Sequence, residues 1–532
     1  QAGSRVDAAC RPASPFPLRV RDTWECGVRM AAVPPCHRDA DAALAPTPLR
    51  IVARFVLRGT YRAVRALPSA QGAVLLLGGY TPKLNALAEV LLVNGVQAVY
   101  LTPRAALRGA DAIADMVDEQ GWAILYVLPL SDSAVFVSDI LNSRLGALAN
   151  DPSTSFLRRD KFAQQEALRQ AGLPAAAQHL VSSALGAKLA ARALLQVGGG
   201  ADAEVAGAEY PATHAGAAPG EGGERHAAAA APAAVVVKPK DSSGGDGIWL
   251  CSTEDHAGTA ASEELWRCNV EGAVNSELII MEAFLAEEEW VVNSVSRLGE
   301  HKVTDMWCGP PKALQPQDRS SPAQFVYTEH FLASGSQRRD DVIAFCCAVL
   351  DALGLQSGAA HTEIVWTAHG PRLLEVNARP SGGLPRTPAR PNQLEALAMS
   401  LFQPDRFAEL PLAPPDGGFA AAVVFLCAPF DGWLRCEALE AIVSLGTFHR
   451  FDRDLLGHHG GTRPVRVSRT VGLFSSPGAV VLQGTCDEAV RSDAAEIRRI
   501  EATGYAAMLE PVIAPTALPP PAPPPAQCAG AT

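Results

Sequence analysis

Short apolar runs alternate with segments of helical periodicity between residues 71 and 155. AVLLLGG, VQAVYLT and WAILYVLP have the composition of β-strands, and helices are predicted near Leu84–Val93 and Ala105–Glu119. Strands that alternate with helices favour a small parallel α/β domain. The turn Gly78–Gly79–Tyr80 follows the first strand, at the end where such sheets bind ligands, although a simple tight turn is the commoner explanation. No GxGxxG motif is present, so a dinucleotide site is not predicted.

A second pattern, further along the chain, predicts a β-hairpin. Its apolar strands TEIVW and RLLEVN are joined by the turn residues HGP,. Glu363 lies in the first strand and Glu375 in the second, and Asn377 shares a face with Glu375 because side chains two apart on a strand point the same way. Pairing would gather three oxygen donors suited to Mg²⁺ that carries a polyphosphate, with Arg379 able to bind a phosphate or a carboxylate. A solvent-facing acidic hairpin is the alternative; it is disfavoured because IVW and LLEV look buried, and a buried unpaired carboxylate is costly.

Two lysines precede this hairpin in the chain. Phe156–Leu173 is predicted as one helix with Lys161 in its first turn, where most lysines are merely solvated,. A later strand, VVVKP, delivers Lys238 to the loop Ser242–Gly247, whose glycines would let backbone N–H groups approach phosphate oxygens,. A flexible linker is the alternative for this loop, and the absence of GKS or GKT excludes a P-loop. The Ala/Gly/Glu tract at about 196–233 is predicted to be a disordered insertion.

The segment ELIIMEAFLAEEEWVVNSV predicts a strand, a short crossing segment at Glu282–Leu285, and a second strand that carries Glu289 and Asn293,. A helix is predicted over Asp340–Leu353, directly before the hairpin. Near the C-terminus, AAVVFLCAP and AVVLQG read as strands, and a final helix is predicted near Asp487–Ala502.

In this order the parts resemble the ATP-grasp superfamily over about Leu157 to Leu401. The resemblance implies a nucleotide held between two α+β subdomains, with these contacts: Lys161, Lys238, Ser242, Ser243, Gly244 and Gly245 with phosphates; Glu282 and main-chain groups of Ala283, Phe284 and Leu285 with adenine; Glu289 with ribose. It also implies that Glu363, Glu375 and Asn377 hold Mg²⁺ (or Mn²⁺), and that Lys238 and Arg379 act on the transferring phosphoryl or acyl group.

Within that superfamily, HTEI followed by LLEVNARPSGG looks like the L-amino-acid ligases that form dipeptides, and like carnosine synthase. The resemblance implies ATP, a small carboxylate and an amine as substrates, joined through an acyl phosphate. The long Ala-rich tract departs from the short loop expected in such ligases. An ATP-grasp carboxylase or purine-pathway enzyme and a non-catalytic nucleotide-binding module are the alternatives. His361 is open between a place near the substrates and a packing role.

Composition limits the class of protein further. The formal net charge of −11 argues against a nucleic-acid partner, and no apolar run reaches membrane-spanning length,. Twelve scattered cysteines without metal spacing fit a reducing compartment, so a cytoplasmic location is expected,. The Arg-rich stretch at 50–65 leaves an organellar targeting segment as an alternative. A homodimer is one expected assembly.

The predicted fold class is α/β and α+β: an ATP-grasp fold with an N-terminal parallel α/β domain and a C-terminal α+β domain. The predicted divisions are an Arg/Ala/Pro-rich extension (1–70), the α/β domain (71–155), the ATP-grasp domain (156–401), a ligase-type domain (415–510) and a Pro/Ala-rich tail (511–532).

Overall fold

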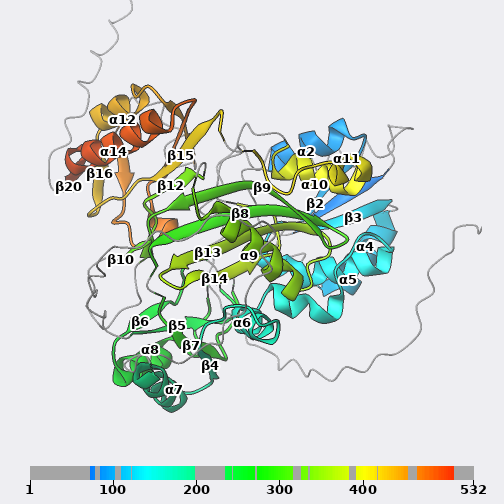
Figure 1. Ribbon diagram of the computed structural model, residues 1–532, viewed down its shortest axis with the longest axis horizontal. Coiled ribbons are helices and arrows are strands. Elements are labelled where there is room, and N and C mark those ends of the chain that lie inside the picture. The colour runs from blue at the N-terminus through cyan, green and yellow to red at the C-terminus, as the bar shows by residue number, and fades with distance from the viewer. Residues whose placement is uncertain are drawn as a thin grey trace, which may run out of the picture. The chain divides into compact units, whose positions relative to one another are not determined.

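The computed structural model describes part of the chain, and Figure 1 labels many of its helices and strands. The described residues are 72–77, 84–101, 109–120, 123–197, 234–242, 244–269, 272–284, 286–314, 325–333, 336–382, 391–415, 417–452 and 464–507. The N-terminal extension, the turn Gly78–Gly79–Tyr80, the insertion from residue 198 to 233 and the Pro/Ala-rich tail lie outside these ranges. In the described part, no helix is both long enough and apolar enough to span a bilayer.

The first sheet is parallel, as the strand–helix alternation predicts. Its strand order is β2-β1-β3, and both pairings are parallel. Its elements are β1 (Ala73–Leu77), α2 (Leu84–Val93), β2 (Gln97–Leu101), α4 (Gly109–Gln120), β3 (Ile124–Pro129), the 3₁₀ turn η1 (Asp132–Ala134) and α5 (Val135–Leu145). Val74 and Leu76 of β1 belong to a core cluster that also contains Val295 and Ala359 of the largest sheet. This shared core packs the first sheet against the largest sheet.

A four-stranded antiparallel sheet carries the strand that ends in Lys238. Its order is β4-β7-β5-β6, and α7 and α8 supply small apolar side chains to its core. The elements are β4 (Gln178–Val181), α7 (Ala184–Val197), β5 (Val235–Pro239), β6 (Trp249–Cys251), α8 (Glu254–Glu264) and β7 (Leu278–Glu282). β5 is one of the two inner strands, and the Lys238 position is paired with Ile279 of β7.

The largest sheet has eight strands in the order β14-β13-β8-β9-β12-β15-β19-β17. The strands are β8 (Glu288–Arg297), β9 (Glu300–Gly309), β12 (Glu329–Leu332), β13 (Gly358–Thr367), β14 (Gly370–Asn377), β15 (Ala420–Phe425), β17 (Phe448–Asp452) and β19 (Ala479–Gly484). β12 pairs with both β9 and β15, so one sheet continues through strands of the predicted ATP-grasp and C-terminal segments. The division between those two domains stays a prediction.

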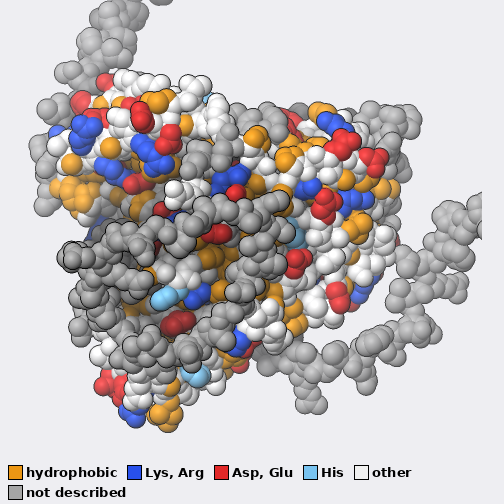
Figure 2. All heavy atoms as spheres, viewed as in Figure 1, with side chains coloured by type: hydrophobic (Ala, Val, Ile, Leu, Met, Phe, Trp, Pro, Cys, Tyr) orange, Lys and Arg blue, Asp and Glu red, His pale blue; other side chains and the backbone are white. Residues whose placement is uncertain are grey.

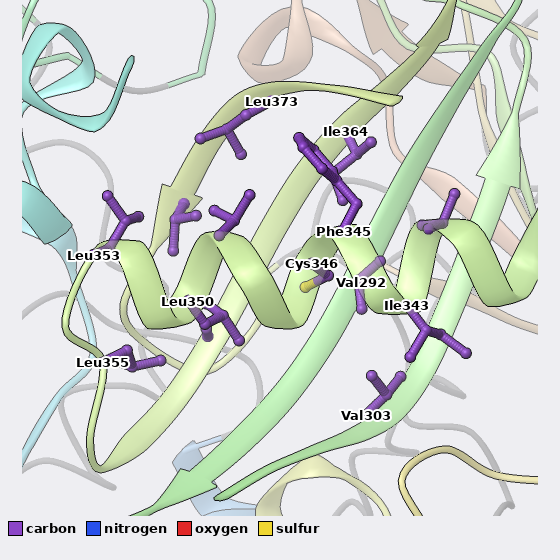
Figure 3. Packing of buried hydrophobic residues seen from close by; sticks show 14 of the residues in the cluster. Val292, Val303, Ile343, Phe345, Cys346, Leu350, Leu353, Leu355, Ile364 and Leu373 are labelled. Atoms are coloured by element: carbon purple, nitrogen blue, oxygen red, sulfur yellow. The ribbon is translucent and has the colours of Figure 1, made fainter. Parts of the chain in front are cut away.

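Helix α9 (Arg339–Ala352) supplies the main hydrophobic core under the hairpin strands, in agreement with the predicted helix at Asp340–Leu353. Figure 3 shows α9 lying against the strands that carry Val292 (β8), Ile364 (β13) and Leu373 (β14), with Phe345 beside Ile364, and all of these side chains belong to one core cluster. These side chains are almost fully buried. Burial of each Leu, Ile or Phe contributes roughly 1.5–3 kcal/mol, so α9 fixes the hairpin firmly beneath the candidate site.

The predicted single helix at Phe156–Leu173 is two elements, which corrects the sequence interpretation. A 3₁₀ helix, η2 (Pro152–Arg158), ends before α6 (Lys161–Gln170) begins. Asp160 separates them, because its side chain accepts from the N–H groups of Phe162 and Ala163 and so acts as the N-cap of α6,. Lys161 is therefore the first residue of a helix rather than part of a continuous one.

Two glutamines attach α6 to β14. The Gln164 amide exchanges hydrogen bonds with the Val376 backbone, at 2.9 and 3.0 Å, and Gln165 Nε2 donates to the Leu373 carbonyl at 2.9 Å. Since both glutamines are buried, these bonds stabilise one placement of the helix,. The start of α6 is thereby held beside the end of β14.

The remaining elements complete the C-terminal region. They are α10 (Gln393–Phe402), α11 (Pro404–Ala408), β16 (Gly432–Leu434), α12 (Cys436–Val443), β18 (Val465–Val467), the 3₁₀ turn η3 (Leu473–Ser475), α14 (Asp487–Gly504) and β20 (Tyr505–Ala507). β16, β18 and β20 form a small antiparallel sheet. The two apolar runs predicted as strands are β15 and β19, and the predicted final helix is α14.

Candidate functional site

The hairpin brings together the three oxygen donors predicted from the sequence. Glu363 of β13 is the direct cross-strand partner of Glu375 of β14, so both carboxylates lie on one face of the pair,. Asn377 Nδ2 donates to Glu375 Oε1 at 3.2 Å. The Glu363 and Glu375 side chains are only 14% and 17% exposed, so cations must compensate their charge,.

Lys161 is one of those cations. Its Nζ lies 2.8 Å from Glu375 Oε2 and donates to the Ser242 carbonyl at 2.5 Å. Burial acts to lower the pKa of Lys161, but the attraction of Glu375 outweighs it and raises the pKa above its ordinary value. The ammonium therefore stays charged where the hairpin meets the loop that begins at Ser242.

Lys312 is the second cation, and sequence reasoning missed it. Its Nζ lies 3.0 Å from Glu363 Oε2 and 2.5 Å from Glu289 Oε1. Burial acts to raise the pKa of Glu363, yet Lys312, together with His361, lowers that pKa well below its usual range. The pKa of Glu289 is raised by its burial. Lys312 therefore connects the predicted ribose ligand to a predicted metal ligand.

Lys238 is buried at the end of β5, and it makes no ion pair with a described residue. Burial, followed by repulsion from Lys161, lowers the pKa of Lys238 to about 8. An ammonium that is desolvated and faces other cations gains most from a nearby anion. The position is thus suited to a phosphate group.

The loop after Lys238 uses glycine where its backbone requires it. Gly244 and Gly245 have φ of 66° and 81°, in the left-handed region that other residues rarely adopt,. Gly247 has φ of 72°, and a Cβ there would meet Arg267 and Glu264 side-chain atoms at 2.7 Å. Ser242 is buried at the start of the loop, while Ser243 lies outside the described residues.

The crossing segment after β7 is partly committed to backbone pairing. Glu282 Oε1 accepts from the Ala177 N–H at 2.9 Å, and the Ala283 N–H donates to the Ala234 carbonyl at 3.1 Å. An adenine contact at Ala283 would therefore come from its carbonyl. Phe284 packs against an apolar cluster that contains Met281. Leu285 lies outside the described residues, and the adenine role of this segment stays a prediction.

Arg379 has a protein partner that the sequence did not suggest. Its Nε and Nη2 both donate to Asp132 Oδ2, at 3.0 and 2.9 Å. Burial acts to raise the pKa of Asp132, but Arg379 lowers it. Asp132 comes just after β3, so the predicted α/β domain holds the guanidinium at the end of β14. The sequence signal that could have identified Asp132 was its position just after a parallel strand, where ligand-binding side chains gather.

His361 joins a polar chain behind Glu363. Its Nδ1 lies 2.9 Å from Asn293 Oδ1, and Asn293 Nδ2 donates to Asp305 at 2.5 Å. Because the amide nitrogen of Asn293 donates to the Asp305 carboxylate, Asn293 Oδ1 is the acceptor of a hydrogen bond from the His361 Nδ1–H group,. The His361 Nε2 atom lies 3.7 Å from Glu363 Oε1, which places the ring beside the site.

The donor chemistry fits magnesium bound together with phosphate. Among the described residues, no three or more His, Cys, Asp or Glu side chains are placed to hold a metal ion as a closed cage. Two carboxylates and an amide are the few oxygen donors that Mg²⁺ takes from protein when substrate phosphates and water complete its octahedron. Figure 2 shows Lys or Arg, Asp or Glu, and His side chains side by side near the centre of the view.

Comparison of the sequence with known proteins identifies one similar protein of named activity. No protein-family model matches the chain. It is 26% identical to dapdiamide A synthase of Enterobacter agglomerans over 434 residues, which cover 79% of this chain and 89% of that protein.

Solved structures are similar at lower identity. An L-amino acid ligase from Bacillus licheniformis aligns with a TM-score of 0.54 and 13% identity, over 81% of this chain and 98% of that one. A carboxyaminoimidazole ribonucleotide synthase from Aspergillus clavatus, complexed with ATP, aligns with a TM-score of 0.52 and 12% identity, over 81% and 99%. At these identities, the structural likeness shows the fold alone.

Proposed function

We propose that this chain, which has the ATP-grasp fold and resembles ATP-grasp ligases that form C–N bonds, is an ATP-dependent carboxylate–amine ligase that joins two amino acids. The observation that carries the proposal is the pairing of Glu363 with Glu375 across the hairpin, with Lys161 and Lys238 close by. A nucleoside triphosphate requires oxygen donors for its divalent ion and ammonium groups for its phosphates.

The first step activates the acid. A carboxylate oxygen attacks the γ-phosphorus of ATP, the bond from that phosphorus to the bridging oxygen breaks, and an acyl phosphate and ADP result. Lys161 and Lys238 offset the phosphate charge, and the loop at 242–247 covers it. Mg²⁺ or Mn²⁺, held by Glu363, Glu375 and Asn377, would supply further charge compensation.

The second step forms the amide. The amine nitrogen attacks the acyl carbon, inorganic phosphate leaves with the electrons of the broken C–O bond, and the nitrogen gives up a proton to phosphate or solvent. Arg379 is charged and fixed by Asp132, so it can stabilise the oxyanion of the tetrahedral intermediate without reorganising,.

The amide ligase is favoured over a carboxylase or purine-pathway enzyme because similarity to dapdiamide A synthase extends over 79% of the chain. The likeness to the ribonucleotide synthase concerns the fold alone. A non-catalytic binding module is disfavoured, because the lysines and the oxygen donors predicted for turnover are all present. Lys161, Glu375 and Asn377 are also in direct contact with one another through Glu375.

A panel of amino-acid pairs tests the proposal, with ADP release and product mass as readouts. The proposal predicts ADP release that requires both partners and a product lighter by one water than their sum. ADP release with bicarbonate as the one effective substrate would favour the carboxylase reading instead. Tight ATP binding without turnover across the panel would favour the binding module.

A further inference from the structure

Lys312 reaches the site from a chain segment between β9 and β12, here called the arm, which contains none of the nucleotide contacts predicted from the sequence. The arm leaves the large sheet after β9 and contains a two-stranded ribbon, β10 (Ala313–Leu314) paired with β11 (Phe325–Val326). It returns to the sheet at β12, the neighbour of β9. Lys312 immediately precedes β10, so its backbone is anchored near the edge of the ribbon and its side chain extends over the hairpin carboxylates.

The ammonium of Lys312 has three partners, and all belong to the site or its wall. Glu289 Oε1 and Glu363 Oε2 lie 2.5 and 3.0 Å from Nζ, and the Tyr327 ring centroid lies 4.6 Å away. The Lys312 side chain is 16% exposed and that of Glu289 is 3% exposed. At this low exposure a neighbouring anion strongly stabilises the ammonium, because an unpaired buried charge is destabilising.

Both carboxylates have other proposed tasks when nucleotide binds. Glu289 would accept the ribose hydroxyls, and Glu363 would ligate the metal ion. A divalent ion at Glu363 competes with Lys312 for the same oxygen, because two cations in contact repel each other strongly in a dry site. Lys312 must then find a new anion, and the polyphosphate that arrives with the metal is the anion closest to hand.

We propose that Lys312 is an exchange counter-ion, which pairs with Glu289 and Glu363 in the free protein and moves onto nucleotide phosphate oxygens when the metal–nucleotide complex binds. This inference rests on the proposed function, since it assumes that the site takes a nucleotide. It adds a third phosphate-binding lysine to Lys161 and Lys238. It also sets an order: metal ion alone binds poorly, because Lys312 already neutralises Glu363.

Pairing with Glu363 weakens the binding of metal ion alone, whereas contact with phosphate strengthens the binding of nucleotide. The variant Lys312→Met in the full chain should therefore change the two affinities in opposite directions. Removing the ammonium exposes Glu363 to metal, so Mn²⁺ alone, followed by electron paramagnetic resonance, should bind about tenfold or more tightly than to the wild type. The same change removes a phosphate contact, so ADP with Mn²⁺ present, measured calorimetrically, should bind about tenfold or more weakly. Neither readout depends on turnover.

Two further variants control the experiment. Lys188→Met removes an exposed lysine paired with Asp255 on α8, and it should change neither affinity. Lys312→Gln keeps a polar end that can hydrogen-bond both carboxylates but carries no charge. It should give the same opposed shifts, so it replaces the methionine variant if that protein does not fold.

The outcomes separate this inference from the function itself. Opposed shifts support the exchange. A fall in both affinities would mean that Lys312 only maintains the shape of the site, and no change in either would mean that it contacts neither ligand; each result overturns the inference. Amide formation by the wild type is measured separately, so the ligase proposal can fail while the exchange stands if nucleotide binds without turnover.

Discussion

The depressed pKa of Lys238 makes nucleotide affinity depend on pH in a defined window. The pKa is about 8 because the group is buried and because Lys161 lies close by, while Glu375 and Glu363 oppose the shift and Lys312 adds to it. A phosphate binds the ammonium form, so bound nucleotide should raise this pKa and draw a proton into the site. Affinity should therefore fall as the pH rises through 8.

The magnitude follows from the fraction of Lys238 that is protonated. With a pKa of about 8, roughly nine-tenths of the side chains carry the proton at pH 7 and roughly one-tenth at pH 9, so affinity should fall about tenfold,. A lysine with its ordinary pKa near 10.5 would stay almost fully protonated across this range, and the affinity would hardly change.

Calorimetric titration with MgADP at pH 7, 8 and 9 measures the effect. Repetition in two buffers of different ionisation enthalpy should show proton uptake that is largest near pH 8 to 9. Lys238→Arg keeps a positive charge throughout this range, so its affinity should be almost independent of pH. If Lys238→Arg loses affinity with pH as steeply as the wild type does, the dependence belongs to another group and the reasoning about Lys238 is wrong.

Three other predictions concern the metal site, the core and the guanidinium. Glu375→Ala should abolish turnover and weaken Mn²⁺ binding in the presence of nucleotide, and near-normal rates would mean that the metal lies elsewhere. Arg158→Met removes one partner of a fully buried ion pair and should lower the free energy of unfolding in urea by about 3–5 kcal/mol, whereas Arg144→Met, at an exposed pair, should cost less than about 1 kcal/mol,. Asp132→Asn frees Arg379 and should lower kcat for amide formation while MgADP affinity is kept; equal losses in both would contradict a positioning role.

The hairpin was predictable because its chemistry is local. Alternation along β14 places Glu375 and Asn377 on one face, and hairpin pairing brings Glu363 to that face, as expected,. The direct pairing of Glu363 with Glu375 depends on a β-bulge between Glu363 and Ile364, which the sequence pattern did not indicate,. The parallel order of the first sheet followed for a similar reason, since strands and helices alternate within 60 residues or so. Local periodicity was therefore sufficient to predict the parallel sheet, the hairpin and the shared face of its oxygen donors.

The other half of the site depends on pairing between distant residues. Lys312 lies in a Pro-flanked segment without periodicity, and its carboxylate partners come from two different strands. Asp132 meets Arg379 across 247 residues of chain. The break before α6 was missed because the N-cap role of Asp160 competes with a continuous helical pattern,. The assembly state and the cellular compartment stay predictions.

The origin of the oxygen in the released phosphate tests the central claim most directly. Turnover with an amino acid whose carboxylate carries oxygen-18 should place one labelled oxygen in inorganic phosphate for each amide formed, because the acyl phosphate passes that oxygen on. Amide formation with unlabelled phosphate would contradict activation of the acid by ATP at this site.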